Sequence, residues 1–164
     1  MAQVVSMSAS ENTSKALVEE VVRSFGKVRL RVLGTSMAPS VLPGDLISIE
    51  RAGLDEISLG EIVLFLQDER LFVHRVISRD VACETPCLIT RGDRLGHNDP
   101  PATAAELLGR VTCIERGHRR FEPGRGVTGW NRFIARVLRA SNLATRAYLH
   151  FLARVRAAEA SWAL

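Results

Sequence analysis

The sequence predicts a mainly β fold with a short helix near its start and a helical segment near its end. Between Lys27 and Glu115, short apolar runs with a period of two alternate with clusters of Gly, Pro, Asp and Asn, a pattern typical of strands joined by turns. No helical pattern interrupts these runs, which favours an antiparallel arrangement. We therefore expect a twisted β-sheet or a partly open barrel.

The first 26 residues are expected to form a tail and one short helix. Met1 to Thr13 shows no periodic pattern and predicts no regular structure. After it, Ser14 can cap a helix that Gly26 ends. Apolar residues recur at helical spacing on one face, namely Leu17, Val18, Val21, Val22 and Phe25. We expect this face to pack on the core.

The central region, residues 27–115, contains six predicted strands. The first alternates Val28, Leu30 and Val32 with arginines, so one of its faces is expected to be buried. Gln67 to Arg70 predicts a hairpin turn between the third and fourth strands. The predicted strands are Val28 to Leu33, Leu46 to Glu50, Glu61 to Leu66, Leu71 to Ser78, Cys87 to Arg91 and Leu107 to Glu115.

Residues 116–164 are predicted to be a basic linker followed by an amphipathic helical tail. Arg116 to Arg120 and Glu122 to Gly126 have the composition of a linker. Beyond them, large apolar residues recur at helical spacing, with a break near Ser141, and arginines supply the charge. These residues are Trp130, Phe133, Ile134, Val137, Leu138, Tyr148, Phe151, Leu152 and Val155. Such a tail can lie on an anionic membrane, pack on a partner, or fold back onto the sheet.

Composition indicates one catalytic domain with appendages, because 164 residues with 46% hydrophobic content can bury one core. The net charge of +4 comes almost wholly from arginine and suits an acidic partner, either a membrane surface, nucleic acid or an acidic peptide. No apolar run is long enough for a membrane-spanning helix, and the N-terminus lacks the pattern of a signal peptide. These features predict a cytoplasmic protein or one peripheral at the membrane.

The three cysteines, Cys83, Cys87 and Cys113, give no framework of disulfides and favour a reducing compartment. Cys83 and Cys87 lie near His97, but their spacing is not that of a zinc-binding pair and no second pair follows. We expect neither a metal nor another cofactor.

Ser36 is the candidate nucleophile. It lies in a turn bounded by glycine and proline between two strand-like runs, a position in which a scaffold can expose a hydroxyl group. A serine hydroxyl needs a base to accept its proton. His74 is the candidate base, in a strand where it shares a face with Phe72 and Val76. A histidine on an apolar face is, by itself, more often a core residue, and it is the serine turn that favours a base here.

The order of several short segments resembles that of type I signal peptidases. The resemblance covers about half of the chain, between about residue 29 and residue 115. A histidine at the place of the base resembles the archaeal and endoplasmic-reticulum branch, which uses a Ser–His pair; Lys15 and Lys27, the only lysines, both precede Ser36. The segments are Ser36-Met37-x-Pro39, Pro43-Gly44-Asp45, Gly60-Glu61-Ile62-Val63, Val73-His74-Arg75-Val76-Ile77 and Thr90-Arg91-Gly92-Asp93.

The resemblance implies a serine endopeptidase with a carboxylate beside the histidine. Asp99 falls where the His-type branch has its second acid and is the expected partner of His74, while Asp93 is expected to be a structural or supporting acid. For both, an ordinary turn residue is the alternative. Arg75, on the opposite face of the His74 strand, is expected to be solvated.

The same resemblance implies an oxyanion site in the turn Gly34, Thr35, Ser36 and Met37. The family usually has a serine where Gly34 stands, and the loss of its hydroxyl costs about a hundredfold in rate unless Thr35 or another backbone N–H group compensates. Gly34 also fits a purely structural role in a tight turn.

The expected substrate is an extended peptide or precursor protein, with small side chains before the scissile bond, and the expected role is precursor processing. One alternative is a LexA-like self-cleaving regulator. That class uses a lysine base and a helix-turn-helix domain, for which the segment before Lys27 is too short, so nucleic acid is not the expected partner. The other alternative is a catalytically inactive peptide-binding module that docks at a membrane.

Overall fold

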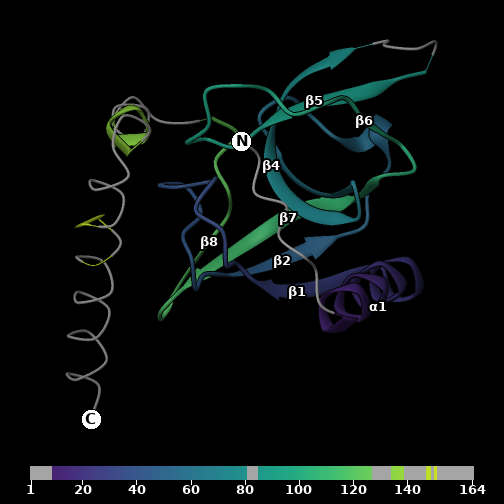
Figure 1. Ribbon diagram of the computed structural model, residues 1–164, viewed down its shortest axis with the longest axis horizontal. Coiled ribbons are helices and arrows are strands. Elements are labelled where there is room, and N and C mark those ends of the chain that lie inside the picture. The colour runs from purple at the N-terminus through teal and green to yellow at the C-terminus, as the bar shows by residue number, and fades with distance from the viewer. Residues whose placement is uncertain (1–8, 81–84, 127–133, 139–146, 149, 151–164) are drawn as a thin grey trace.

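The computed structural model describes residues 9–80, 85–126, 134–138, 147–148 and 150, with the backbone alone for residues 9–14. A single antiparallel sheet forms the body of the protein, and this confirms the prediction of a mainly β fold (Figure 1). Residues 134–138 are helical. The elements are α1 (Ala9–Phe25), β1 (Lys27–Arg31), β2 (Leu46–Glu50), the 3-10 helix η1 (Leu54–Glu56), β3 (Ile62–Gln67), β4 (Arg70–Asp80), β5 (Cys87–Arg91), β6 (Ala102–Thr103), β7 (Leu107–Arg116) and β8 (Arg119–Phe121).

The strands lie in the order β1-β2-β7-β3-β4-β5-β6, and β8 adds to β7. Figure 1 shows the sheet strongly curved, with α1 beside β1. Among the described strands β1 and β6 lie at opposite ends of the order and do not pair, so the sheet is not closed.

The hairpin between β3 and β4 presents His74 and confirms the predicted turn. Gln67 pairs with Arg70, and Asp68 and Glu69 adopt φ values of 46° and 56°, as type I′ hairpin turns require. On its other side β4 pairs with β5 only from Arg75 onward. The first half of β4, up to His74, therefore has a neighbouring strand on one side only, as far as the structure describes the chain.

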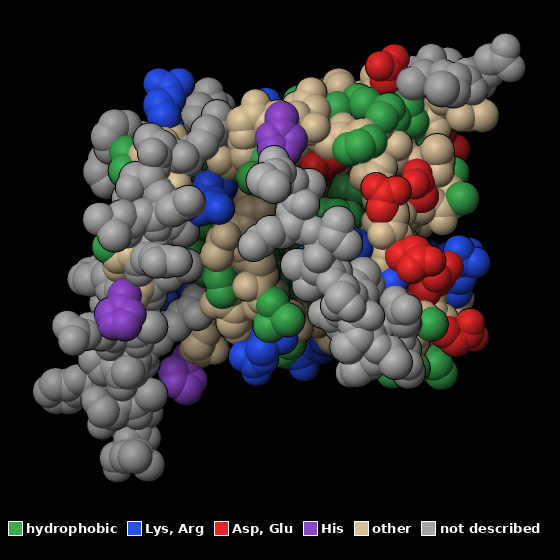
Figure 2. Space-filling view, in the orientation of Figure 1, with side chains coloured by type: hydrophobic (Ala, Val, Ile, Leu, Met, Phe, Trp, Pro, Cys, Tyr) green, Lys and Arg blue, Asp and Glu red, His purple; other side chains and the backbone are tan. Residues whose placement is uncertain are grey.

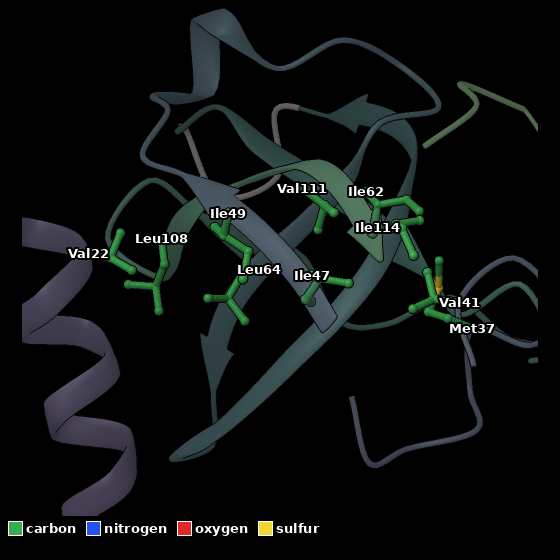
Figure 3. Close-up of a cluster of buried hydrophobic side chains, with 10 residues drawn as sticks. All are labelled: Val22, Met37, Val41, Ile47, Ile49, Ile62, Leu64, Leu108, Val111 and Ile114. Atoms are coloured by element: carbon green, nitrogen blue, oxygen red, sulfur yellow. The ribbon is translucent and has the colours of Figure 1, made fainter. Parts of the chain in front are cut away.

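The core is built from the sheet and from two residues of α1, Val22 and the partly buried Val18. Val22 is fully buried against the sheet, together with residues of β2, β3, β7 and the turn after β1 (Figure 3). Leu17 and Phe25 are exposed, so the apolar face of the helix packs only in part. The helix also begins before the predicted cap, Ser14, because polar residues of moderate helix propensity extend it to Ala9.

The segment predicted as a basic linker from Arg116 to Arg120 is instead a hairpin. β7 continues to Arg116, Gly117 turns the chain at φ +59°, and β8 follows. The Arg116 guanidinium lies over the Phe121 ring, 5.4 Å from its centre. Composition misled the prediction because long arginine side chains can cover apolar surface while their charge stays near water.

The described part of the C-terminal segment folds back on the domain. Ile134, Leu138 and Tyr148 form a cluster with Ala38 and Leu42, which belong to the turn that carries Ser36. The remaining residues of the predicted tail, among them Trp130, Phe133, the break at Ser141, Phe151, Leu152 and Val155, lie outside the described residues. Membrane contact through this tail stays a prediction.

Acidic side chains are distributed unevenly on the face drawn in Figure 2, where most of them lie on the right-hand half. Within the described ranges, no helix combines the length and apolar character needed to cross a membrane. Cys87 and Cys113 are buried free thiols, and Cys83 is not among the described residues. No group of three potential metal-binding side chains occurs in the described part of the chain.

Candidate active site

The turn that carries Ser36 is tied to the core by its neighbours. After β1 the chain runs into a turn in which the Ala38 N–H donates to the Thr35 carbonyl (3.1 Å) and the Val41 N–H to the Met37 carbonyl (3.0 Å). The Met37 side chain is only 2% exposed and belongs to the main apolar cluster. Ser36 is therefore held at the surface by a buried residue that directly follows it.

A buried carboxylate holds the far end of the same turn. Asp45 is completely buried and accepts hydrogen bonds from the Leu42 N–H (2.8 Å) and the Arg116 guanidinium (2.7 Å). Arg116 also donates to the Ser40 carbonyl (3.0 Å). The sequence drew attention to Asp45 but not to Arg116, because the two residues are distant in the chain and meet only when β2 pairs with β7.

Ser36, His74 and Asp99 form a hydrogen-bonded series. The Ser36 Oγ lies 2.9 Å from His74 Nε2, and His74 Nδ1 lies 2.6 Å from Asp99 Oδ2. A carboxylate only accepts hydrogen bonds, so Nδ1 carries the hydrogen and Nε2 is left as an acceptor for the serine hydroxyl. His74 is 3% exposed and contacts the rings of Phe65 and Phe72.

Thr90 orients Asp99, and sequence reasoning missed it. The Thr90 hydroxyl donates to Asp99 Oδ2 (2.6 Å), and the Asp99 N–H donates to the Thr90 carbonyl (2.8 Å). Thr90 is fully buried in β5 beside β4, where it pairs with Val76. The sequence feature that could have indicated this role is the place of Thr90 in the Thr-Arg-Gly-Asp segment. His97, close to Asp99 in sequence, is exposed.

Asp93 pairs with Arg75. Its two carboxylate oxygens accept from Arg75 Nε and Nη2, both at 2.8 Å, and the two side chains are 2% and 5% exposed. Arg75 also donates to the carbonyls of Gly60 and Gly124, each at 2.7 Å. The prediction that Arg75 is solvated is wrong, because the loops carrying these glycines cover its face of β4.

Comparison with family models matches residues 5–84 to the family Peptidase S24-like. By this match the chain is similar to S24-like peptidases. The matched segment includes Ser36 and His74 and ends before Asp99. The match supports a serine-type peptidase, including the self-cleaving LexA-like kind, and does not reach the finer assignment to signal peptidases. No curated protein matches the chain.

Gly92 lies against the Ser36 backbone and the His74 ring, beyond the S24-like segment. A Cβ atom there would lie 2.7 Å from the Ser36 carbonyl oxygen, 3.0 Å from Leu95 Cγ and 3.1 Å from His74 Nε2. The chain needs this close approach, since the Arg94 N–H donates to the same Ser36 carbonyl (2.9 Å). Glycine is therefore required by space at this position.

We expect Gly92→Ala to slow labelling of Ser36 by a serine-directed probe about a hundredfold, because the methyl group displaces the Ser36 backbone or the imidazole, and a displacement of about 1 Å has that effect. The rate constant of labelling measures it. Gly126→Ala is the control, since a Cβ at Gly126 meets nothing within 4 Å. Equal rates for the two variants would contradict this account.

The oxyanion site stays a prediction, and the backbone of the turn is compatible with it. Within the described chain, the N–H groups of Thr35, Ser36 and Met37 donate to no protein acceptor. Gly34 has an ordinary φ, and a Cβ there would meet nothing within 4 Å. The geometry of the turn therefore does not require glycine at this position.

Gly34→Ser is accordingly expected to be accommodated, and to raise the rate of probe labelling about tenfold if its hydroxyl donates to the developing oxyanion. Gly34→Ala controls for the added methylene group and should leave the rate near that of the wild type. A serine variant no faster than the alanine variant would show that this position supplies no donor.

A cleft of about 550 Å³ opens beside Ser36 and His74. One wall comes from β1 and the residues after it, and the other comes from the first half of β4. Leu30, Val32, Leu71 and Val73 give both walls an apolar character. The cleft thus borders the part of β4 that pairs, among the described strands, with β3 alone.

Proposed function

We propose that this protein is a serine endopeptidase of the signal-peptidase type, with Ser36 as the nucleophile and His74 as the general base. The observation that carries the proposal is the hydrogen-bonded series from Ser36 Oγ through His74 to Asp99, at 2.9 Å and 2.6 Å. The similarity to S24-like peptidases supports the same class of activity.

In the proposed reaction, His74 Nε2 takes the hydroxyl proton while Ser36 Oγ attacks the scissile carbonyl carbon, and the carbonyl electrons move to the oxygen. Asp99 stabilises the imidazolium that forms. Collapse of the intermediate expels the amine, which takes the proton from His74 and leaves an acyl group on Ser36. Water, deprotonated by His74, then releases the acid and restores Ser36.

The substrate of this reaction would be an extended peptide segment of a precursor protein. Among the described strands, none pairs with the first half of β4 along the cleft, and a strand edge of this kind binds peptide backbone by adding a strand. Processing of a precursor is therefore the role that we assign to the protein.

Labelling with a fluorophosphonate probe, followed by intact-mass measurement, tests the proposed function. We expect one adduct on the wild type and none on Ser36→Ala or His74→Ala. Ser40→Ala, in the same turn, is the matched control and should be labelled, because Ser40 contacts Arg116 through its carbonyl. An adduct retained by Ser36→Ala, or none on the folded wild type, would contradict the proposal and favour a peptide-binding module.

The similarity to S24-like peptidases gives a second candidate, cleavage of the protein's own chain in the LexA-like manner. Incubation of the purified protein at several concentrations separates the two. Self-cleavage within one molecule proceeds at a rate that is independent of dilution and is lost in Ser36→Ala, whereas a peptidase acting on other proteins leaves its own chain intact.

A further inference from the structure

The cleft beside Ser36 carries charge of one sign. Among the described residues that line it, three are arginines, Arg31, Arg70 and Arg94, and none is an aspartate or a glutamate. The remaining lining side chains are aliphatic or aromatic, apart from those of Thr35, Ser36 and His74. A positive cleft with apolar walls concentrates the field of its cations and attracts acidic ligands.

Two of these arginines have a defined place along the cleft. Arg94 lies next to the nucleophile, because its own N–H donates to the Ser36 carbonyl (2.9 Å). Arg31 donates from Nη1 to the Gly44 carbonyl (3.1 Å), which holds its guanidinium near the turn that carries Ser36. The Arg31 contact uses one guanidinium N–H group and leaves others able to donate.

Arg70 marks the far end of the cleft. It is the first residue of β4, four residues before His74, so it lies about 13 Å along the strand from the histidine. Its side chain is exposed and has no hydrogen-bond or ion-pair partner among the described residues. The neighbouring acids of the turn, Asp68 and Glu69, do not line the cleft, and Glu69 is paired with Lys15 (3.7 Å).

We infer that the cleft selects apolar extended peptides that carry an acidic side chain about four residues from the scissile bond. The inference rests on the proposed function and names its substrate class. A peptide beside β4 advances at about the same rise per residue as the strand, so a carboxylate four residues from the reacting carbonyl reaches Arg70. Arg31 adds positive charge nearer to Ser36.

A binding selection tests the inference without requiring catalysis. A degenerate library of decapeptides is passed over immobilised Ser36→Ala protein, and the bound peptides are sequenced by mass spectrometry. We expect Asp and Glu to be enriched about two- to fivefold over Asn and Gln, as for one partly exposed charge pair. The enrichment should fall in 0.5 M salt, which is about the concentration at which surface charges are strongly screened.

Two further variants test whether Arg70 is responsible for the preference for acidic peptides. Adding Arg70→Gln to the Ser36→Ala protein should abolish the acidic preference at one position of the peptide. Arg119→Gln changes the net charge equally, and Arg119 lies on β8 outside the cleft lining, so the preference should persist. Equal binding of acidic and amide peptides, or equal loss in both arginine variants, would overturn the inference.

The proposed function is tested by a different measurement from the one that tests the acidic preference. Probe labelling of the wild type reports on Ser36 and His74, whatever the library shows. A labelled protein without acidic preference retains the peptidase proposal and loses this inference, whereas acidic preference on a protein that is never labelled indicates a peptide-binding module with the inferred specificity.

Discussion

Replacing Asp99 with alanine is expected to slow probe labelling of Ser36 by about a thousandfold to ten-thousandfold. Asp99 Oδ2 accepts hydrogen bonds from both His74 Nδ1 and the Thr90 hydroxyl, each at 2.6 Å. Without this oxygen the imidazole loses the contact that fixes its tautomer, and the imidazolium formed during attack loses its counter-charge. The rate constant of labelling, measured on folded protein, gives the effect directly.

Asp99→Asn separates orientation from charge. Both hydrogen bonds end on the same carboxylate oxygen, so an amide oxygen in that place can accept both while carrying no negative charge. We expect this variant to be labelled at a rate between those of the wild type and Asp99→Ala. His97→Ala is the control, because His97 is exposed. Labelling of Asp99→Ala at the wild-type rate would remove Asp99 from the mechanism.

The largest effect on stability is expected from Asp93→Ala. This change leaves the Arg75 guanidinium, 5% exposed, without the carboxylate that it contacts through two nitrogens. Removing one partner of a buried ion pair costs about 3–5 kcal/mol, since the remaining charge stays away from water. For a chain of this size that corresponds to a fall in Tm of about 10 °C, measured by thermal unfolding.

A surface ion pair supplies the comparison. Arg29 contacts Glu115 at 2.5 Å, but its side chain is 56% exposed, and such pairs contribute about 1 kcal/mol or less. Arg29→Gln should therefore change Tm by only a few degrees. If Asp93→Ala unfolds at the same temperature as Arg29→Gln, the Arg75–Asp93 pair contributes nothing beyond a surface contact.

The local sequence pattern was sufficient to predict most of the strands and turns. The alternation in β1, the apolar run of β3 and the turn at Asp68 and Glu69 each reflect interactions between near neighbours, so strand positions and the hairpin could be predicted. β6 and β8 were missed, because strands of two or three residues carry too short a pattern. The tail was predicted as amphipathic, yet only packing decides where its described residues lie.

The residues of the candidate site also fall into those that the sequence predicted and those that it did not. Ser36 and His74 were singled out because each belongs to a short segment with a recognisable order, and Asp99 because of its spacing from Asp93. Thr90 and Gly92 also lie in such a segment, but the sequence predicted no role for either residue. Their importance depends on distances to residues elsewhere in the chain, and no local pattern encodes those distances.

The sequence by itself determined the order of strands and turns, the hydroxyl group in a turn, and a histidine on an apolar strand, since these depend on backbone preferences and on the periodicity of apolar side chains. Only the tertiary structure decided which carboxylate meets His74, that Arg75 is buried with Asp93, and that Gly92 must lack a side chain. Strand pairing brings β4 and β5 together and sets the loop after β5 against the turn of Ser36. Contacts between residues so distant in the chain depend on strand register and sheet curvature, and not on neighbouring residues.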